Sequence, residues 1–86
     1  MCIVSELAAA RKTQKLTQAA LADAAGLSRM TVQRIETLDI DPRLSTLQEM
    51  ARAMDMELML VPKSLRSELN ALVRATDLQN LGPAGP

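Results

Sequence analysis

Arg29, Gln33 and Arg34 are the side chains whose types and spacing best suit a specific chemistry in this chain. The guanidinium group of arginine can donate two hydrogen bonds to O6 and N7 of guanine, and the amide of glutamine can pair with N6 and N7 of adenine. Met30, beside them, can offer an apolar contact to a thymine methyl group. On a helix that turns by about 100° per residue, Met30, Gln33 and Arg34 point away from the face that carries Val32 and Ile35, and Arg29 stands at the exposed N-terminal corner. The spacing therefore suits a helix that hydrogen-bonds the edges of bases.

Two short helices joined at a glycine would position these side chains, within the segment TQAALADAAGLSRMTVQRIE from Thr17 to Glu36. The hydroxyl of Thr17 can cap the first helix, and that of Ser28 can cap the second. Gly26 lies between them, where the chain must turn with positive φ. Two helices that meet at such a turn set one helix into the major groove of DNA. We therefore expect double-stranded DNA as a partner, although the same outward side chains could form only a solvated helix face.

Length and composition favour one small helical domain. The chain has 86 residues, of which 48% are hydrophobic, but it contains no Phe, Tyr or Trp, so the core must be built from aliphatic, alanine and methionine side chains. Cys2 is the only cysteine, which excludes an intramolecular disulfide and is typical of a reducing compartment. No apolar run approaches the roughly 20 residues that cross a bilayer. We expect a cytoplasmic protein that does not contact a membrane.

Charge and residue usage bear on the kind of function. The sequence lacks histidine, so it offers neither an imidazole base for a nucleophile nor a His/Cys metal cluster. We therefore expect no enzyme activity, no catalytic residues, no metal and no cofactor. Ten basic and ten acidic residues cancel, whereas DNA-binding domains often carry a positive excess. A single copy should bind DNA weakly, so specificity would depend on a dimer.

The helical pattern predicts four core helices within a DNA-binding domain over residues 1–55. Apolar residues at helical spacing indicate a first helix over about 3–14, and the two helices around Gly26 follow over 17–25 and 28–37. Asp41-Pro42 marks a loop, because the residue before proline avoids helical geometry. Ser45 is then predicted to cap a fourth helix that ends between residues 53 and 55.

The run MELMLV, over residues 56–61, is read as a β-strand because it is short, apolar and closed by Pro62. No second strand candidate exists in the chain, and a lone strand leaves its backbone groups unpaired. The economical solution is antiparallel pairing with the same segment of a second subunit across a two-fold axis. This predicts a homodimer. The predicted dimerisation residues are Glu57, Leu58, Met59, Leu60 and Val61.

The remaining residues are predicted to form a C-terminal helix and a tail. Ser64 can cap an amphipathic helix that reaches about Thr76 and carries an apolar stripe including Leu65, Leu69 and Leu72. Together with the strand it forms a dimerisation region over residues 56–76. The tail, over residues 77–86, ends in LGPAGP and is expected to be flexible.

The pattern T-Q-x-x-L-A-x-x-x-G-[LI]-S-x-x-T-[VI]-x-x-[IL]-E resembles the Xre/Cro-type helix-turn-helix regulators and the lambdoid phage repressors. The resemblance is close over residues 16–36 and looser over about 3–55. It implies a mainly α, lambda-repressor-like bundle in which Arg11 pairs with Glu36. The base-reading positions would be Arg29, Met30, Gln33 and Arg34. Phosphate contacts are predicted for Thr17, Gln18, Ser28, Thr37 and Arg43.

The C-terminal half is similar to HipB-like antitoxins, in which a short strand pairs between subunits. That resemblance implies a kinase-like toxin as a further partner, although this chain adds a helix after the strand. Three functions therefore remain open. The first is a DNA-binding transcriptional regulator, most simply a repressor, on a palindromic operator. The second is an antitoxin that also represses its own operon, and the third is a protein-interaction adaptor that uses the apolar stripe.

Overall fold

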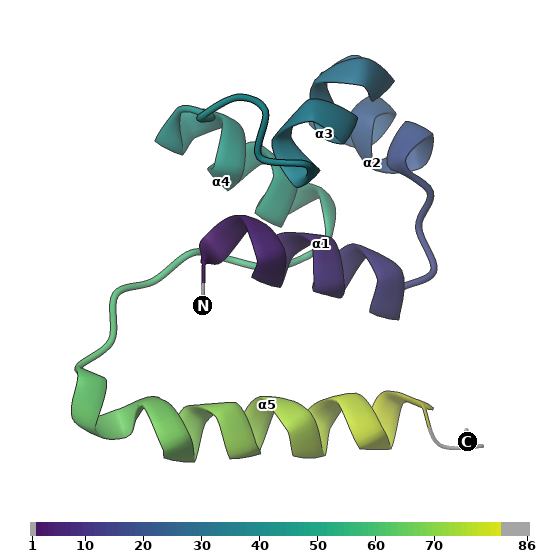
Figure 1. Ribbon diagram of the computed structural model, residues 1–86. Coiled ribbons are helices and arrows are strands. Elements are labelled where there is room, and N and C mark those ends of the chain that lie inside the picture. The colour runs from purple at the N-terminus through teal and green to yellow at the C-terminus, as the bar shows by residue number, and fades with distance from the viewer. Residues whose placement is uncertain (1, 82–86) are drawn as a thin grey trace.

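Aliphatic, alanine and methionine side chains at helical spacing build the core, as the composition predicted. The computed structural model describes residues 2–81, with side chains as far as residue 76, and this range is mainly helical (Figure 1). Its helices are α1 (Ile3–Thr13), α2 (Gln18–Ala25), α3 (Arg29–Glu36), α4 (Leu44–Ala53), the 3-10 turn η1 (Lys63–Leu65) and α5 (Arg66–Leu81). The buried side chains are Val4, Leu7, Leu21, Ala22, Ala25, Val32, Ile35, Leu47, Met50, Ala51 and Met54.

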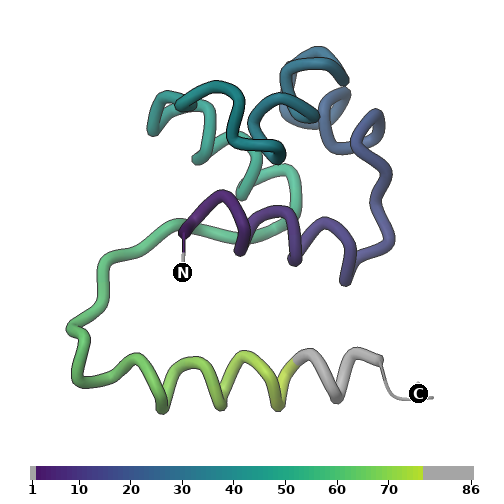
Figure 2. Tube along the Cα trace, viewed as in Figure 1, coloured from purple at the N-terminus to yellow at the C-terminus, as the bar shows by residue number. Residues whose placement is uncertain are grey.

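The first four helices enclose that core, and every buried side chain except Met54 lies on one of them. Helix α2 packs against α3 and α4, and α1 closes the bundle by packing against the same two helices. Figure 2 shows α1, in purple, along the lower edge of this bundle, with the other three helices above it. The four predicted core helices are therefore confirmed, with bounds that differ by only one or two residues.

Each of these four helices is followed by a residue in the left-handed conformation. These residues are Lys15, Gly26, Leu38 and Asp55, with φ of 59°, 72°, 65° and 59°. After α3, for example, the N–H groups of Leu38 and Asp39 donate to carbonyls of its last turn at 3.0 and 2.9 Å. This pair of bonds satisfies carbonyls that the helix itself leaves free, and glycine is the usual residue at such a position. Only one of the four is a glycine, so the other three ends carry no such mark in the sequence.

The predicted cap of the fourth helix is wrong by two residues. Arg43 has extended backbone angles and is the N-cap of α4, where no side chain caps the helix. Ser45 lies one residue inside the first turn instead, because the extended loop after Pro42 already ends at Arg43. From there its hydroxyl is not at the capping position.

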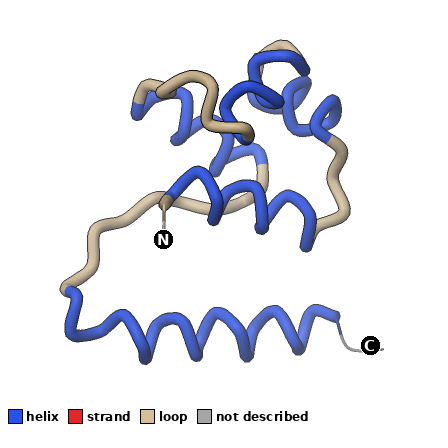
Figure 3. Tube along the Cα trace, in the orientation of Figure 1, coloured by secondary structure: helices blue, strands red, loops and turns tan. Residues whose placement is uncertain are grey.

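The predicted strand over residues 56–61 is not present in the single chain, where this segment is loop (Figure 3). A strand requires a partner ladder, and residues 2–81 contain no strand that could supply one. Leu58 is partly buried against the core. By contrast, Met59 and Leu60 are 76% and 101% exposed.

The C-terminal helix differs from its prediction at both ends. Ser64 lies within η1 rather than capping the helix, and α5 begins at Arg66. Helix α5 continues past Thr76 to Leu81, so residues 77–81 are helical and not the tail predicted there. The rest of that predicted tail, residues 82–86, lies outside the described residues.

Helix α5 leaves most of its apolar stripe uncovered. Within its described side chains Leu69 is half-buried, but Leu72 and Val73 are 63% and 55% exposed. An open groove separates α5 from the bundle. It is lined by Gln14, Met54 and Met56 on one side and by Leu72, Val73 and Thr76 on the other. No helix in the described range is long and apolar enough to span a membrane.

Candidate nucleic-acid interface

The turn between α2 and α3 has the geometry that the sequence predicted. Thr17 caps α2, since its Oγ1 accepts a hydrogen bond from the N–H of Ala20 at 3.0 Å. Gly26 ends that helix with φ 72° and ψ 30°. Ser28 caps α3, since its Oγ accepts from the N–H of Thr31 at 3.0 Å. The two capping hydroxyls and the glycine together define where α3 begins and in which direction it runs.

Helix α3 separates its two faces sharply. Val32 and Ile35 are 0% and 1% exposed and point into the core. The four predicted base-reading side chains all lie on the exposed face, and they are Arg29, Met30, Gln33 and Arg34. Figure 1 shows α3 at the outer edge of the bundle, on the side away from α5. The arrangement presents two guanidinium groups, one amide and one thioether side chain to whatever this helix contacts.

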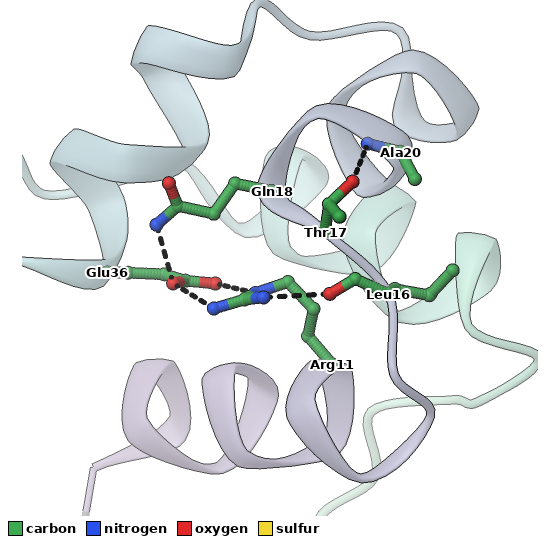
Figure 4. A network of polar contacts seen from close by, with 6 residues as sticks. All are labelled: Arg11, Leu16, Thr17, Gln18, Ala20 and Glu36. Carbon is green, nitrogen blue, oxygen red and sulfur yellow. Dashed lines mark hydrogen bonds and ion pairs between the residues drawn. The ribbon is translucent and has the colours of Figure 1, made fainter.

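A network of polar contacts holds the C-terminal end of α3 against the bundle (Figure 4). Arg11 donates from Nε to Oε2 of Glu36 at 2.7 Å and from Nη2 to Oε1 at 3.0 Å. Its third donor, Nη1, reaches the carbonyl oxygen of Leu16 at 2.8 Å. The pairing of Arg11 with Glu36 that the family resemblance implied is therefore confirmed. The loop before α2 and the end of α3 are fastened to α1 through one side chain.

The electrostatics of Glu36 follow from this network. Burial alone would raise the pKa of the Glu36 carboxyl. The hydrogen bonds from Arg11 and Gln18, with the charges of Arg11 and Lys12, outweigh burial and hold that pKa below its ordinary value. In turn, the hydrogen bond to Glu36 raises the pKa of Arg11. Both groups remain charged at neutral pH.

Gln18 takes part in the same network, which the sequence did not indicate. Its Nε2 donates to Oε1 of Glu36 at 3.0 Å. An amide nitrogen carries two N–H groups, and this bond uses one of them. The other is available to a phosphate, so the predicted phosphate contact is compatible with the network and remains a prediction.

The other predicted phosphate-contacting side chains lie at helix ends. Thr17 and Ser28 accept the capping bonds described above, and their hydroxyl groups are exposed. Thr37 Oγ1 donates to the carbonyl of Arg34 at 3.3 Å, and Arg43 is exposed at the start of α4. Helix N-termini provide free N–H groups for anions, which suits Thr17, Ser28 and Arg43. The end of α3 offers no such group, so Thr37 depends on its hydroxyl alone.

Sequence reasoning missed a second polar tie made by α1. Gln14 Nε2 donates to the carbonyl oxygen of Met54 at 3.0 Å, joining the end of α1 to the end of α4. Nothing in the residue spacing points to this contact, because the two residues are 40 positions apart. Arg11 lies in the last turn of α1 and Gln14 is the C-cap residue that follows this helix, so the two side chains bind the end of α1 to both α3 and the exit from α4.

An α-helical bundle with a glycine turn and an outward polar helix defines a protein of the helix-turn-helix class. The helix-turn-helix family model matches residues 7–60. The chain therefore belongs to this family, in its Xre-type branch, which comprises DNA-binding transcriptional regulators and antitoxins.

Curated relatives agree with this assignment. The chain is 40% identical over 63 residues to an uncharacterized HTH-type transcriptional regulator, y4dL, of Sinorhizobium fredii, a match that covers 73% of this chain and 32% of the relative. It is 44% identical over 59 residues to the antitoxin HigA1 of Mycobacterium tuberculosis, covering 69% of this chain and 40% of the relative. The matched parts thus span less than half of either relative. No solved structure matches the chain.

Proposed function

We propose that this chain is a sequence-specific transcriptional regulator that binds a palindromic operator as a homodimer and represses transcription. One observation carries the proposal: α3 turns Arg29, Met30, Gln33 and Arg34 outward while Arg11 and Glu36 fasten it to the bundle. A helix that contacts base edges, here called the reading helix, needs both outward side chains and a fixed position. Base contacts confer specificity only when their register is fixed.

Each outward side chain has a defined role in this proposal. Arg29 and Arg34 donate to guanine, Gln33 pairs with adenine, and Met30 contacts a thymine methyl group. The phosphates are bound by Thr17, Gln18, Ser28, Thr37 and Arg43. Because the chain carries ten basic and ten acidic residues, its nonspecific attraction to DNA is small. The base contacts and the presence of two subunits supply the affinity instead.

The segment over residues 57–61 supports the dimer. In the single chain these residues make no backbone hydrogen bond, and Leu60 projects entirely into solvent. Antiparallel pairing with the same segment of a second copy would satisfy both sets of backbone groups and cover Met59 and Leu60. Two reading helices related by this axis would bind half-sites about 34–36 Å apart.

Selection of bound sequences from random double-stranded DNA tests this proposal. We expect a two-fold symmetric sequence to be enriched, with half-sites about one helical turn apart. Enrichment of a single asymmetric half-site would contradict the dimer but would still agree with base contacts by α3. If no sequence is enriched, the proposed function is wrong.

A second function, that of an antitoxin, is favoured by the similarity to the antitoxin HigA1 and by the uncovered stripe of α5. In this case the chain binds its operator and a kinase-like toxin, encoded by a neighbouring gene, through Leu69 and Leu72. The toxin should co-purify with the full chain and be lost with Leu69→Asp but not with Arg34→Ala. An adaptor that does not bind DNA would show the same partner loss, but it would enrich no DNA sequence in the selection.

A further inference from the structure

We infer that Gln14 is a positioning residue that sets the distance and angle between the two half-sites of the operator. The inference rests on the proposed function, since it concerns how one reading helix is held relative to the dimer axis. It assigns a role to a contact that lies outside the reading helix and outside the proposed dimer segment.

The position of Gln14 makes it a link between those two parts. The chain leaves the bundle at Met54 and Asp55, directly before the segment proposed to pair with a second copy. Gln14 binds the carbonyl oxygen of Met54 at that exit, at 3.0 Å. One turn earlier on α1, Arg11 binds Glu36 at the end of α3. The last turn of α1 and its C-cap residue thus hold the reading helix α3 at one point and the start of the dimer segment at another.

The exit itself depends on few other contacts. Asp55 has a left-handed backbone with φ 59°, and the N–H groups of Asp55 and Met56 donate back to the last turn of α4. Met54 is 2% exposed, whereas Met56 is 43% exposed. The chain therefore changes from buried to exposed within two residues, and the Gln14 amide donates a side-chain hydrogen bond to this stretch. Without it, the direction in which residues 56–61 leave the bundle is set by the helix end, by the buried Met54 side chain and by Leu58.

The geometry of DNA makes this direction matter. Each base pair added between half-sites moves one of them by about 3.4 Å along the axis and rotates it by about 34°. A rigid dimer discriminates against such a change, whereas a dimer with a loosened connection adapts to it. Loss of the Gln14 contact should therefore relax the choice of spacing without changing the bases read within each half-site.

The test compares Gln14→Glu with Gln48→Glu. Gln48 is exposed on α4, and its side chain makes no hydrogen bond with the described residues. Both changes lower the net charge equally, and a glutamate cannot donate to the Met54 carbonyl. The operator recovered from random DNA is compared with versions that have one base pair inserted or removed between the half-sites, and Kd is measured for each. Kd is also measured for a DNA that contains one isolated half-site, to which the spacing does not apply.

We expect the wild-type protein and Gln48→Glu to prefer the recovered spacing. In Gln14→Glu that preference should fall by about fivefold, which lies within the roughly two- to thirtyfold range for residues that couple two sites. Affinity for the isolated half-site should match that of Gln48→Glu. Sedimentation of each variant checks that both remain dimers.

Two results would overturn the inference. Equal spacing preference in the two variants would show that Gln14 does not set the geometry, and loss of half-site affinity in Gln14→Glu would show a general defect instead. Failure of the wild-type protein to bind any DNA would be different, because it would overturn the proposed function and this inference together.

Discussion

Arg11 on α1 and Glu36 on α3 lie 25 positions apart in the sequence, yet two hydrogen bonds join their side chains. Only 11% and 9% of these side chains are exposed, so the pair is largely withdrawn from water. Charged groups in that position depend on each other, because either one alone would be left buried without a partner. The pair therefore determines how firmly the end of the reading helix is held.

Removing the charge of Glu36 should destabilise the whole bundle. We expect Glu36→Gln to lower the free energy of unfolding by about 3 kcal/mol, because Arg11 loses its counterion in a poorly hydrated site. Urea unfolding followed by circular dichroism measures this change. Glu68→Gln, on the exposed side of α5, is the matched control and should leave the unfolding free energy nearly unchanged. Equal effects of the two substitutions would contradict a stabilising role for the pair.

The same pair should make stability depend on pH. The pKa of Glu36 is lowered in the folded protein, so its contribution is fully present above the ordinary glutamate pKa of about 4.3. It is lost as the pH falls through the lower pKa of the folded state. Acidification below about pH 4 should therefore narrow the difference in unfolding free energy between the wild-type protein and Glu36→Gln. A difference that stays constant in that range would argue that the charge of Glu36 contributes nothing.

The left-handed residues after α2 and α3 predict opposite effects of glycine. Leu38 has φ 65° and is 63% exposed, so Leu38→Gly removes backbone strain without opening the core. Relief of a strain of about 1–2 kcal/mol is partly offset by the greater freedom of glycine in the unfolded chain, so we expect a net stabilisation of about 0.5–1 kcal/mol. Gly26→Ala should instead destabilise by about 1 kcal/mol. An added Cβ there would meet no atom within 4 Å, so the cost is conformational. Thermal unfolding of each variant measures whether its stability rises or falls relative to the wild-type protein.

The reading helix predicts a loss of DNA affinity without a loss of fold. Arg34→Ala should weaken binding to the selected operator by about 1–3 kcal/mol, because a two-bond contact to guanine is removed. Arg74→Ala, on the exposed α5, removes the same charge and should change affinity far less. Fluorescence anisotropy measures both. If Arg34→Ala binds as the wild-type protein does, Arg34 does not contact the operator.

The dimer segment predicts that one exposed leucine controls oligomeric state. Because Leu60 is 101% exposed in the single chain, Leu60→Asp should not disturb the bundle. It should nevertheless yield a monomer by sedimentation, since a charge would be placed in the proposed pairing segment. Leu44→Asp, at a leucine that is 64% exposed on α4, is the control and should remain dimeric. A dimeric Leu60→Asp protein would place the interface elsewhere.

The part of the fold around Gly26 could be predicted from the sequence because its signals are local. A capping hydroxyl, a glycine and a second capping hydroxyl each specify their own backbone conformation, and the structure has all three at the predicted positions. The outward face of α3 followed from periodicity in the same way. The Arg11–Glu36 pair came only from the family resemblance, because no local rule connects residues that far apart.

Other features could not be predicted because they depend on tertiary context. Lys15 and Leu38 adopt a left-handed conformation that their types do not favour, and Asp55 adopts one that aspartate visits only occasionally, so none of the three is marked by its type alone. The strand over residues 56–61 was inferred from apolar composition, but ladder hydrogen bonds need a second segment that the single chain does not supply. Gln14 and Gln18 make contacts whose partners become apparent only when the helices are packed.

The loop over residues 57–61, in which Leu58 alone is partly buried, also bears on how long the protein survives in a cell. Proteases cleave most readily in exposed loops, and this stretch is a loop that is exposed except at Leu58 and makes no backbone hydrogen bond in a single copy. In the dimer we propose, each copy shields that stretch on the other. The protein's lifetime would then lengthen as its own concentration rises, so that a falling supply is amplified by faster destruction of the copies that have lost their partners.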